Sequence, residues 1–452
     1  MFRQRSLAIF SLAILTGVIT SMRHAAIPSS FFMQHRQRMQ AMLPPGSLAV
    51  VNTNDIPPTN SDGSRLLMPS SDLFYLTGIE QEETVLVMAP TALDEKNRTM
   101  LFIRKPDPTM IVVEGKKLDF KDASELSGIS EVRWLDDLPM ILHKLMCEME
   151  LVYLNSNEHP RAVIEVETRE ARFISEFMKR FPLHRYCRLA PLMHALRVLK
   201  DPTELALMRQ ACVITRDAFM SVLRDLRPGM NECEIEAIYA YEFTRKRAFF
   251  AYNAIVASGL NACTLHYNAN DQTCKDGDLL LLDVAASYAN YNSDLTRTIP
   301  VNGRFTPRQR QVYDAVLRIK KAMTKNAVPG KLWRDWQQES EDLCADELVG
   351  LGLLKKEDNR RDENGKSPCK KYYMHGGGHS IGLDVHDVSN LTKPFAVGWC
   401  LTVEPGIYIP EEGFAVRLED VITITKDGHT NLMADIPIEA DDIERLMAAR
   451  SR

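Results

Sequence analysis

The sequence predicts a protein of mixed α/β (α+β) structure with two domains, a smaller N-terminal α/β domain and a larger C-terminal domain. First, the 452 residues exceed what one hydrophobic core usually organises. Second, short apolar runs bounded by turn residues fill the first part, as expected for buried strands. Third, two pairs of long helical segments occur later in the chain, and strand-like runs follow each pair.

Composition, charge and cysteine usage exclude several classes of protein. Hydrophobic residues make up 45% and charged residues 25% of the chain, which is typical of a globular protein and not of disordered or multi-span membrane chains. The net charge of -5 lacks the basic surplus that nucleic-acid binding favours. The nine cysteines are odd in number and form no Cys-x-x-Cys spacing, so we expect a reducing, cytoplasmic location.

Residues 1–26 have the layout of a targeting segment. Arg3 and Arg5 precede an apolar run over residues 7–19, as in a signal peptide. The run is short for a membrane span, which needs about 20 apolar residues. If Met22 is the true start, the run is a misassigned extension. Export through a signal peptide therefore stays an alternative to the cytoplasm.

The N-terminal domain is expected over residues 27–185. Apolar runs at 47–51, 84–88 and 99–103 predict buried strands, and residues 165–181 predict a helix. Asp72 and Tyr75 lie in the Ser-Asp-Leu-Phe-Tyr-Leu-Thr-Gly segment, where we expect structural roles. This half contains no sharp catalytic pattern.

The second domain is expected over residues 190–452, after a boundary at 182–200. Asp201-Pro202-Thr203-Glu204 is a strong helix start, because Asp can cap free N–H groups and Pro fits the first helical position. The helix is predicted to run to 226, and a second helix covers 231–246. A similar pair is predicted at 306–326, starting with a capping box, and at 332–349. The recurrence suggests an internal two-fold repeat.

Chemistry-bearing residues gather at the strand ends of this second domain. Asp283 ends the apolar run 279–283, and Asp294 follows eleven residues later, after a hairpin turn at Ala289-Asn290 that could bring the two carboxylates together. Three histidines then occur within twelve residues among glycines. A glutamate precedes Pro-Gly, and two charged residues share one face of a predicted strand at 415–424. The residues in these last three patterns are His375, His379, His386, Glu404, Arg417 and Glu419.

Taken one at a time, each of these residues has a plain structural explanation, such as a turn cap or a satisfied polar group. Taken together they do not, because four carboxylates and several histidines cannot be buried in one place without cations. A donor set rich in carboxylate oxygen suits two divalent metals and lacks the thiolates of structural zinc. Mn²⁺ or Co²⁺ fits better than a cysteine-bound zinc ion.

The motifs resemble those of the "pita-bread" metallopeptidases, the group that contains methionine aminopeptidase, prolidase, creatinase and aminopeptidase P. The likeness is greatest to the proline-specific branch and extends over nearly the whole chain. The segments that carry it are Gly-Leu-Asp-Val-His-Asp (382–387), Val-Glu-Pro-Gly-Ile-Tyr (403–408), Arg-Leu-Glu-Asp (417–420), Asp-Leu-Thr-Arg-Thr-Ile-Pro-Val-Asn-Gly (294–303), Pro-Gly-Ser (45–47) and residues 71–78.

The resemblance implies a pita-bread catalytic domain and a specific set of site residues. The implied metal ligands are Asp283, Asp294, His379, Glu404 and Glu419, with Asp294 and Glu419 bridging two ions, manganese first and cobalt or zinc as alternatives. His266, His375 and His386 match the family's supporting histidines, Glu404 is the general base, and Arg417 is assigned to catalysis. His266, His386, Tyr408 and Arg417 are placed near the substrate.

The resemblance also implies a reaction, namely release of the N-terminal residue from peptides with proline in the second position, by a homodimer or homotetramer. A prolidase, which cuts only Xaa-Pro dipeptides, is the alternative enzyme. A non-catalytic peptide-binding homologue is a distant third possibility, disfavoured because all five ligands are present. The sequence departs from the family pattern at Val284-Ala285-Ala286 after Asp283, and at Val113, where relatives often have tryptophan. In the family the region around Val113 can reach the site of a neighbouring subunit. The second departure therefore bears on the assembly of subunits and on the preference for longer peptides.

Overall fold

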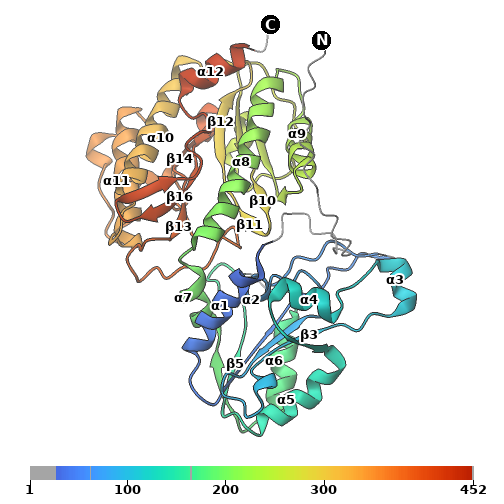
Figure 1. The fold of residues 1–452 in the computed structure, drawn as a ribbon. Coiled ribbons are helices and arrows are strands. Elements are labelled where there is room, and N and C mark those ends of the chain that lie inside the picture. Colours follow the sequence, from blue (N-terminus) through green and yellow to red (C-terminus); the bar gives the residue numbers. More distant parts are fainter. Residues whose placement is uncertain (1–26, 62, 163–164, 450–452) are drawn as a thin grey trace, which may run out of the picture.

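The apolar runs of the first part form one six-stranded sheet in a computed structural model that describes residues 27–449 except 62, 163 and 164 (Figure 1). The sheet has the order β4-β3-β2-β1-β5-β6, and β1 pairs antiparallel with β2 and parallel with β5. The three predicted strands are confirmed to within one residue at each end as β1, β2 and β3. The strands are β1 (Ser47–Asn52), β2 (Val85–Met88), β3 (Thr99–Ile103), β4 (Glu131–Trp134), β5 (Leu151–Leu154) and β6 (Arg185–Arg188).

Seven helices of this part pack around the sheet or lead away from it. The predicted helix at 165–181 is present but begins later, because Thr168 caps it by accepting a hydrogen bond from the Ala171 N–H. Strand β6 begins at Arg185, where we expected the domain to end, and extends the sheet to Arg188. The helices are α1 (Ser29–Met42), α2 (Ser71–Thr77), α3 (Pro108–Glu114), α4 (Phe120–Ser127), α5 (Leu138–Met146), α6 (Arg169–Arg180) and α7 (Ala190–Arg197).

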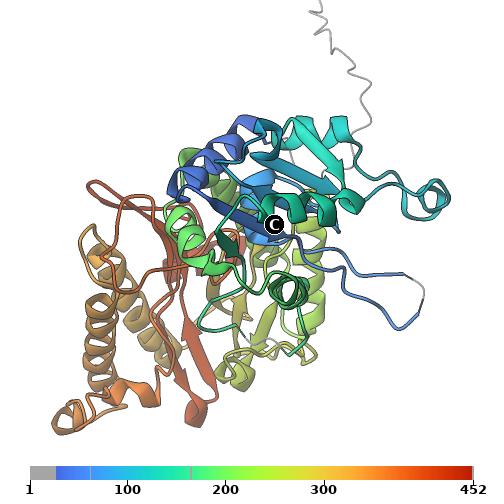
Figure 2. The same cartoon turned by 90° about the horizontal axis from the view of Figure 1, so that it is seen from below.

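Helix α3 projects from the body of the N-terminal domain, as both views show (Figures 1 and 2). It carries Val113, one of the two positions at which the sequence departs from the pattern it resembles. Val112 and Val113 are 89% and 74% exposed. Two neighbouring valines are thus presented to solvent at the edge of the molecule.

The second part contains the two predicted helix pairs, and their start signals are confirmed. Asp201 and Glu204 form a capping box at the start of α8, and Thr306 and Gln309 form another at the start of α10. Each of these side chains accepts a hydrogen bond from at least one backbone N–H that would otherwise have no partner at the helix start. The helices are α8 (Pro202–Asp225), α9 (Glu232–Arg245), α10 (Pro307–Asn326), α11 (Trp333–Gly350) and the C-terminal α12 (Ala440–Ala448).

Small antiparallel sheets follow each helix pair and lie against it (Figure 1). The first pair is followed by sheets β12-β9-β8 and β11-β10-β7, and the second by β13-β16-β17 and β14-β15. The strands are β7 (Phe249–Phe250), β8 (Ile255–Ser258), β9 (Leu279–Asp283), β10 (Ala286–Tyr288), β11 (Tyr291–Asn292), β12 (Thr296–Pro300), β13 (Cys400–Val403), β14 (Gly406–Ile409), β15 (Phe414–Arg417), β16 (Asp420–Thr425) and β17 (Gly428–Asn431).

The single strand predicted at 415–424 is wrong, because the chain leaves one sheet and enters another in its middle. Strand β15 pairs with β14, whereas β16 pairs with β13 and β17. Between them, the Leu418 N–H donates to the Pro405 carbonyl and the Glu419 N–H donates to the Thr296 carbonyl. These two bonds replace ladder pairing and connect the break to β12 and to the loop after β13.

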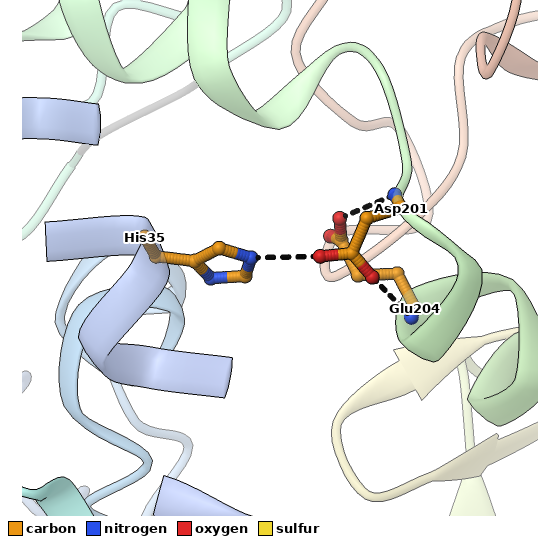
Figure 3. Close-up of side chains that lie close together, drawn as sticks. All are labelled: His35, Asp201 and Glu204. Atoms are coloured by element: carbon orange, nitrogen blue, oxygen red, sulfur yellow. Dashed lines mark hydrogen bonds and ion pairs between the residues drawn. The ribbon is translucent and has the colours of Figure 1, made fainter. Parts of the chain in front are cut away.

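The two domains meet through buried polar contacts. His35 of α1 points across the junction, and its Nε2 lies 3.1 Å from Oδ2 of Asp201 at the start of α8 (Figure 3). Arg197, at the end of α7 and 4% exposed, donates to Asp72 of α2 at 2.7 Å and, across the junction, to Asp384 of the second domain at 2.7 Å. Asp72 therefore fixes the junction, and Tyr75 stacks on His35 with ring centroids 3.8 Å apart.

Within the described residues, no helix is both long and apolar enough to cross a membrane. The expected signal peptide over residues 1–26 lies outside the described part of the chain.

Candidate metal centre

Asp283 and Asp294 come together because strands β9 and β12 pair antiparallel, with Asp283 opposite Thr296. The turn predicted at Ala289-Asn290 is present, and both of its residues have positive φ, which suits a tight hairpin. The Tyr252 hydroxyl lies 2.5 Å from Oδ1 of Asp283 and 2.6 Å from Oδ1 of Asp294. One hydroxyl thus connects the two carboxylates.

His379 and Glu404 approach the same point from the glycine-rich segment and from the end of β13. His379 Nε2 lies 3.3 Å from Oδ2 of Asp294 and 3.7 Å from Oε1 of Glu404. Its Nδ1 donates to the Ser380 carbonyl at 3.0 Å, so the Nε2 atom faces the carboxylates. Gly378 allows this approach, since a Cβ there would lie 2.2 Å from the Thr402 carbonyl oxygen.

Glu419 completes the set from the break between β15 and β16. Its Oε2 accepts a hydrogen bond from the Thr296 hydroxyl at 2.6 Å. Ligand atoms of Asp294, His379 and Glu419 all lie within 4.8 Å of one another. The structure therefore brings all five sequence-predicted ligands to one place, from elements spread over residues 283–419.

The charges of these groups fit divalent cations. Burial raises the pKa of Glu404 to about 7, and nearby Asp294 adds to the rise. Burial followed by the charge of Asp294 raises the pKa of Glu419, and burial raises that of Asp283. The protein alone thus leaves buried carboxylates that repel one another, and bound divalent ions would neutralise them. Oxygen-rich coordination with one imidazole suits Mn²⁺ and Zn²⁺ alike.

A hydrogen-bonded chain supports the centre from behind. Arg417 donates to Oδ2 of Asp283 at 2.6 Å and to the Tyr408 hydroxyl at 2.7 Å. Since a guanidinium can only donate, the Tyr408 hydroxyl donates onward to Nε2 of His375 at 2.8 Å, and His375 Nδ1 donates to the Gly376 carbonyl. Tyr408, which the resemblance places near the substrate, is fully buried and is not among the residues that line the cavity described below. Its hydroxyl braces His375 and Arg417.

The three histidines of the segment have different electrostatic settings. Burial lowers the pKa of His379, but its hydrogen bond with Asp294 and the charge of Glu404 outweigh burial and raise the pKa to about 9. Burial and then Arg417 lower the pKa of His375 to about 3. Burial, the charge of His379 and then Arg161 lower that of His386 to about 3. His375 and His386 are therefore neutral near pH 7.

A cavity of about 740 Å³ opens over the centre, a volume suited to a short peptide. His266 is exposed and lines this cavity, as do His386 and Arg417. A second lobe of about 400 Å³, on the side of Trp333 and Gln337 of α11, shares His375, His379 and His386 with the first.

Three residues at this site were missed from the sequence. Tyr252 follows a two-residue strand, Thr296 is an ordinary β-branched strand residue, and Arg161 comes from the N-terminal domain. Arg161 Nη1 lies 3.0 Å from Nδ1 of His386. None of the three stands in a distinctive local pattern, although the aromatic Phe-Phe-Ala-Tyr run (249–252), which includes β7, is a weak signal for Tyr252.

Known proteins share both the sequence and the fold of this chain. The profile of metallopeptidase family M24 matches residues 206–426, and that of the aminopeptidase P N-terminal domain matches residues 32–153. The Xaa-Pro aminopeptidase of Haemophilus influenzae is 33% identical over 436 residues, covering 94% of this chain and 98% of that protein. The Escherichia coli Xaa-Pro aminopeptidase is 34% identical, covering 92% and 97%.

Solved structures agree with these matches. Zinc-substituted E. coli aminopeptidase P in complex with product superposes with a TM-score of 0.84 at 32% identity, covering 95% of this chain and all of that one. The aminopeptidase PepP of Pseudomonas aeruginosa gives a TM-score of 0.84 at 31% identity, covering 94% and 99%.

Proposed function

Since this chain belongs to metallopeptidase family M24 and is a metal-dependent hydrolase with an aminopeptidase P N-terminal domain, we propose that it is an Xaa-Pro aminopeptidase. It would release the first residue from peptides whose second residue is proline. The observation that carries the proposal is the convergence of four carboxylates and one imidazole beneath a peptide-sized cavity. The names of the relatives support the proline specificity.

The five converging residues are the proposed ligands of two divalent ions. Asp294 and Glu419 would bridge the ions, because ligand atoms of both lie within 4.8 Å of each other and of His379. Asp283 and Glu404 would complete the two coordination spheres, and Tyr252 would hold Asp283 against Asp294. We take manganese as the first candidate ion, with cobalt and zinc as alternatives.

A pair of divalent ions, when bound, lowers the pKa of a coordinated water toward ~7 and polarises the scissile carbonyl. The remaining chemistry belongs to this chain's residues. Glu404 accepts the proton of the attacking water and returns it to the leaving nitrogen. His266 and His386 donate hydrogen bonds to the developing oxyanion.

His375 and Arg417 support these groups, because the Arg417–Tyr408–His375 chain fixes the wall behind Asp283. Arg417 also faces the cavity, so it can contact the substrate there. Proline in the second position has a fixed ring and lacks an amide N–H. The cavity beside His386 and Arg417 therefore needs room for a compact ring, and it needs no acceptor for a hydrogen bond from that nitrogen.

The proposal is tested by incubating metal-reconstituted protein separately with the peptides Ala-Pro, Ala-Pro-Ala and Ala-Ala-Ala and measuring the release of alanine. The expected result is cleavage of Ala-Pro-Ala and not of Ala-Ala-Ala. Cleavage of the dipeptide alone would make the protein a prolidase, and binding without turnover of any peptide would make it a non-catalytic homologue. Lengthening the peptides then measures how far the second lobe contributes.

Two further properties are part of this proposal. None of the nine cysteines forms a disulfide, which supports a reducing compartment such as the cytoplasm. The exposed valines on projecting α3 supply an apolar contact for a homodimer or homotetramer. Light scattering of the purified protein measures the oligomeric state.

A further inference from the structure

The N-terminal domain contributes one side chain to the wall of the cavity. Arg161 lies in the connection between β5 and α6, and it is a lining residue of both lobes of the cavity. Its backbone N–H donates to Nδ1 of His159 at 3.2 Å, which orders the connection locally. The 3.0 Å contact between Arg161 Nη1 and His386 Nδ1 therefore joins residues 225 positions apart in the chain.

This contact fixes the tautomer of His386. A guanidinium has five N–H donors and no acceptor, so the Nδ1 atom of His386 accepts the bond and carries no hydrogen. A neutral imidazole has one N–H, which then lies on Nε2. The ring packs 4.1 Å from that of His379, centroid to centroid, at the metal centre. Arg161 thus makes His386 a donor at its other nitrogen.

The backbone of the His386 segment is held by separate contacts. Asp384 accepts from the Ser71 hydroxyl and from Arg197, each at 2.7 Å. Asp387 accepts from Arg197 at 2.6 Å and from Lys200 at 2.8 Å. These pairs, of which those of Asp387 are buried and those of Asp384 half-buried, flank His386 on both sides and hold the segment independently of Arg161. The contact that Arg161 makes with this segment is to the imidazole ring.

We propose that Arg161 is a positioning residue for hydrolysis, which acts across the domain junction to hold His386 with its proton on Nε2. The proposal rests on the proposed function, because it assigns Arg161 to the oxyanion-donating role of His386. It also gives the N-terminal domain a part in positioning a residue of the site. Because an oxyanion donor acts mainly in the transition state, the loss of Arg161 should lower kcat and leave KM nearly unchanged.

The first experiment reads the tautomer without activity. Protein labelled with ¹⁵N-histidine is compared by long-range ¹H–¹⁵N NMR with Arg161→Ala, and His386→Ala assigns the resonance. We expect the Nε2–H form of His386 in the wild type and a mixture of both tautomers in Arg161→Ala. Arg172→Ala is the control, because Arg172 is an exposed arginine of the same domain that pairs with Asp55 away from the cavity.

The second experiment is a double-mutant cycle on Ala-Pro-Ala with metal-loaded protein. Arg161→Ala should lower kcat about tenfold to 100-fold, the usual range for residues that orient another site residue. In the His386→Ala background the same change should have no further effect. Arg172→Ala should behave as wild type.

Several outcomes would overturn the inference. A wild-type His386 with its proton on Nδ1 would remove the structural basis, and so would an unchanged tautomer in Arg161→Ala. A full effect of Arg161→Ala in the His386→Ala background would mean that Arg161 acts on the substrate directly. If the wild type cleaves no peptide, the proposed function fails, and the NMR comparison still decides whether Arg161 fixes the ring.

Discussion

Replacing Asp420 with asparagine should strongly destabilise the second domain. Asp420 is 2% exposed and directly follows the ligand Glu419. Its Oδ1 accepts from Arg297 at 2.7 Å, and its Oδ2 is bonded to the Lys320 ammonium. Arg297 and Lys320 are 0% and 5% exposed, so the neutral amide would leave two buried cations without their counter-charge. Removing one partner of such a buried pair costs ~3–5 kcal/mol.

Thermal unfolding followed by circular dichroism measures this effect. For a domain of this size, ~3–5 kcal/mol corresponds to a fall in Tm of ~6–20 °C. Asp441→Asn is the matched control, because Asp441 also pairs with an arginine, Arg310, but its side chain is 82% exposed. The control should leave Tm unchanged. An Asp420→Asn protein that unfolds within ~1 °C of wild type would refute this reasoning.

The same cluster sets a pH dependence of stability. Burial opposes ionisation of Asp420, but Arg297 and Lys320 outweigh burial and lower its pKa below the ordinary value. A carboxyl whose pKa is lower in the folded than in the unfolded protein stabilises the fold at every pH above its unfolded-state pKa. This contribution is lost as the pH falls through the pKa of the folded state. In Asp420→Asn this acid-sensitive part of the stability should be absent.

Four predictions concern the metal centre. Glu404→Ala should lower turnover of Ala-Pro-Ala by ~10²–10⁴-fold, because a ligand and the proton acceptor are lost together; wild-type turnover would contradict both roles. Asp294→Ala should reduce the metal content measured by plasma mass spectrometry, and full content with full activity would exclude a bridging role. His386→Ala should lower kcat by ~10²–10³-fold with metal content retained, and unchanged kinetics would remove it from the oxyanion site. A chelator should abolish activity and Mn²⁺ should restore it, whereas activity that survives exhaustive chelation would argue against metal catalysis.

Helix starts were predictable because their signals are local. Asp201 and Glu204, three positions apart, satisfy each other's backbone donors, and Thr306 and Gln309 repeat the arrangement. Both boundaries agree with the sequence prediction to within a residue. The helix at 165–181 was placed too early, because Thr168 is the residue whose side chain caps it.

The strand over 415–424 could not be predicted correctly, because its break depends on distant backbone. The alternation of residues continues through Leu418 and Glu419, so a local pattern indicates one strand. The Pro405 and Thr296 carbonyls instead take the N–H groups of those two residues. Arg417 and Glu419 still reach the same site, although they do so from a bend and not from one face of a strand.

The candidate site was predictable where acids and histidines stand at strand ends. Asp283 ends the apolar strand β9 and Glu404 follows the apolar strand β13, where an unpaired charge is costly and thus informative. Tyr252 and Arg161 carry no such signal, because a tyrosine or an exposed arginine has many ordinary explanations. Arg161 belongs to the other domain, so only the domain arrangement brings it to His386.

Anomalous diffraction from crystals soaked in Mn²⁺ tests the central claim most directly. The account predicts two manganese peaks per chain, separated by ~3.5–4 Å, with Asp294 and Glu419 between them and His379 bound through Nε2. A map without paired peaks among Asp283, Asp294, His379, Glu404 and Glu419, from protein that otherwise binds the ion, would contradict it.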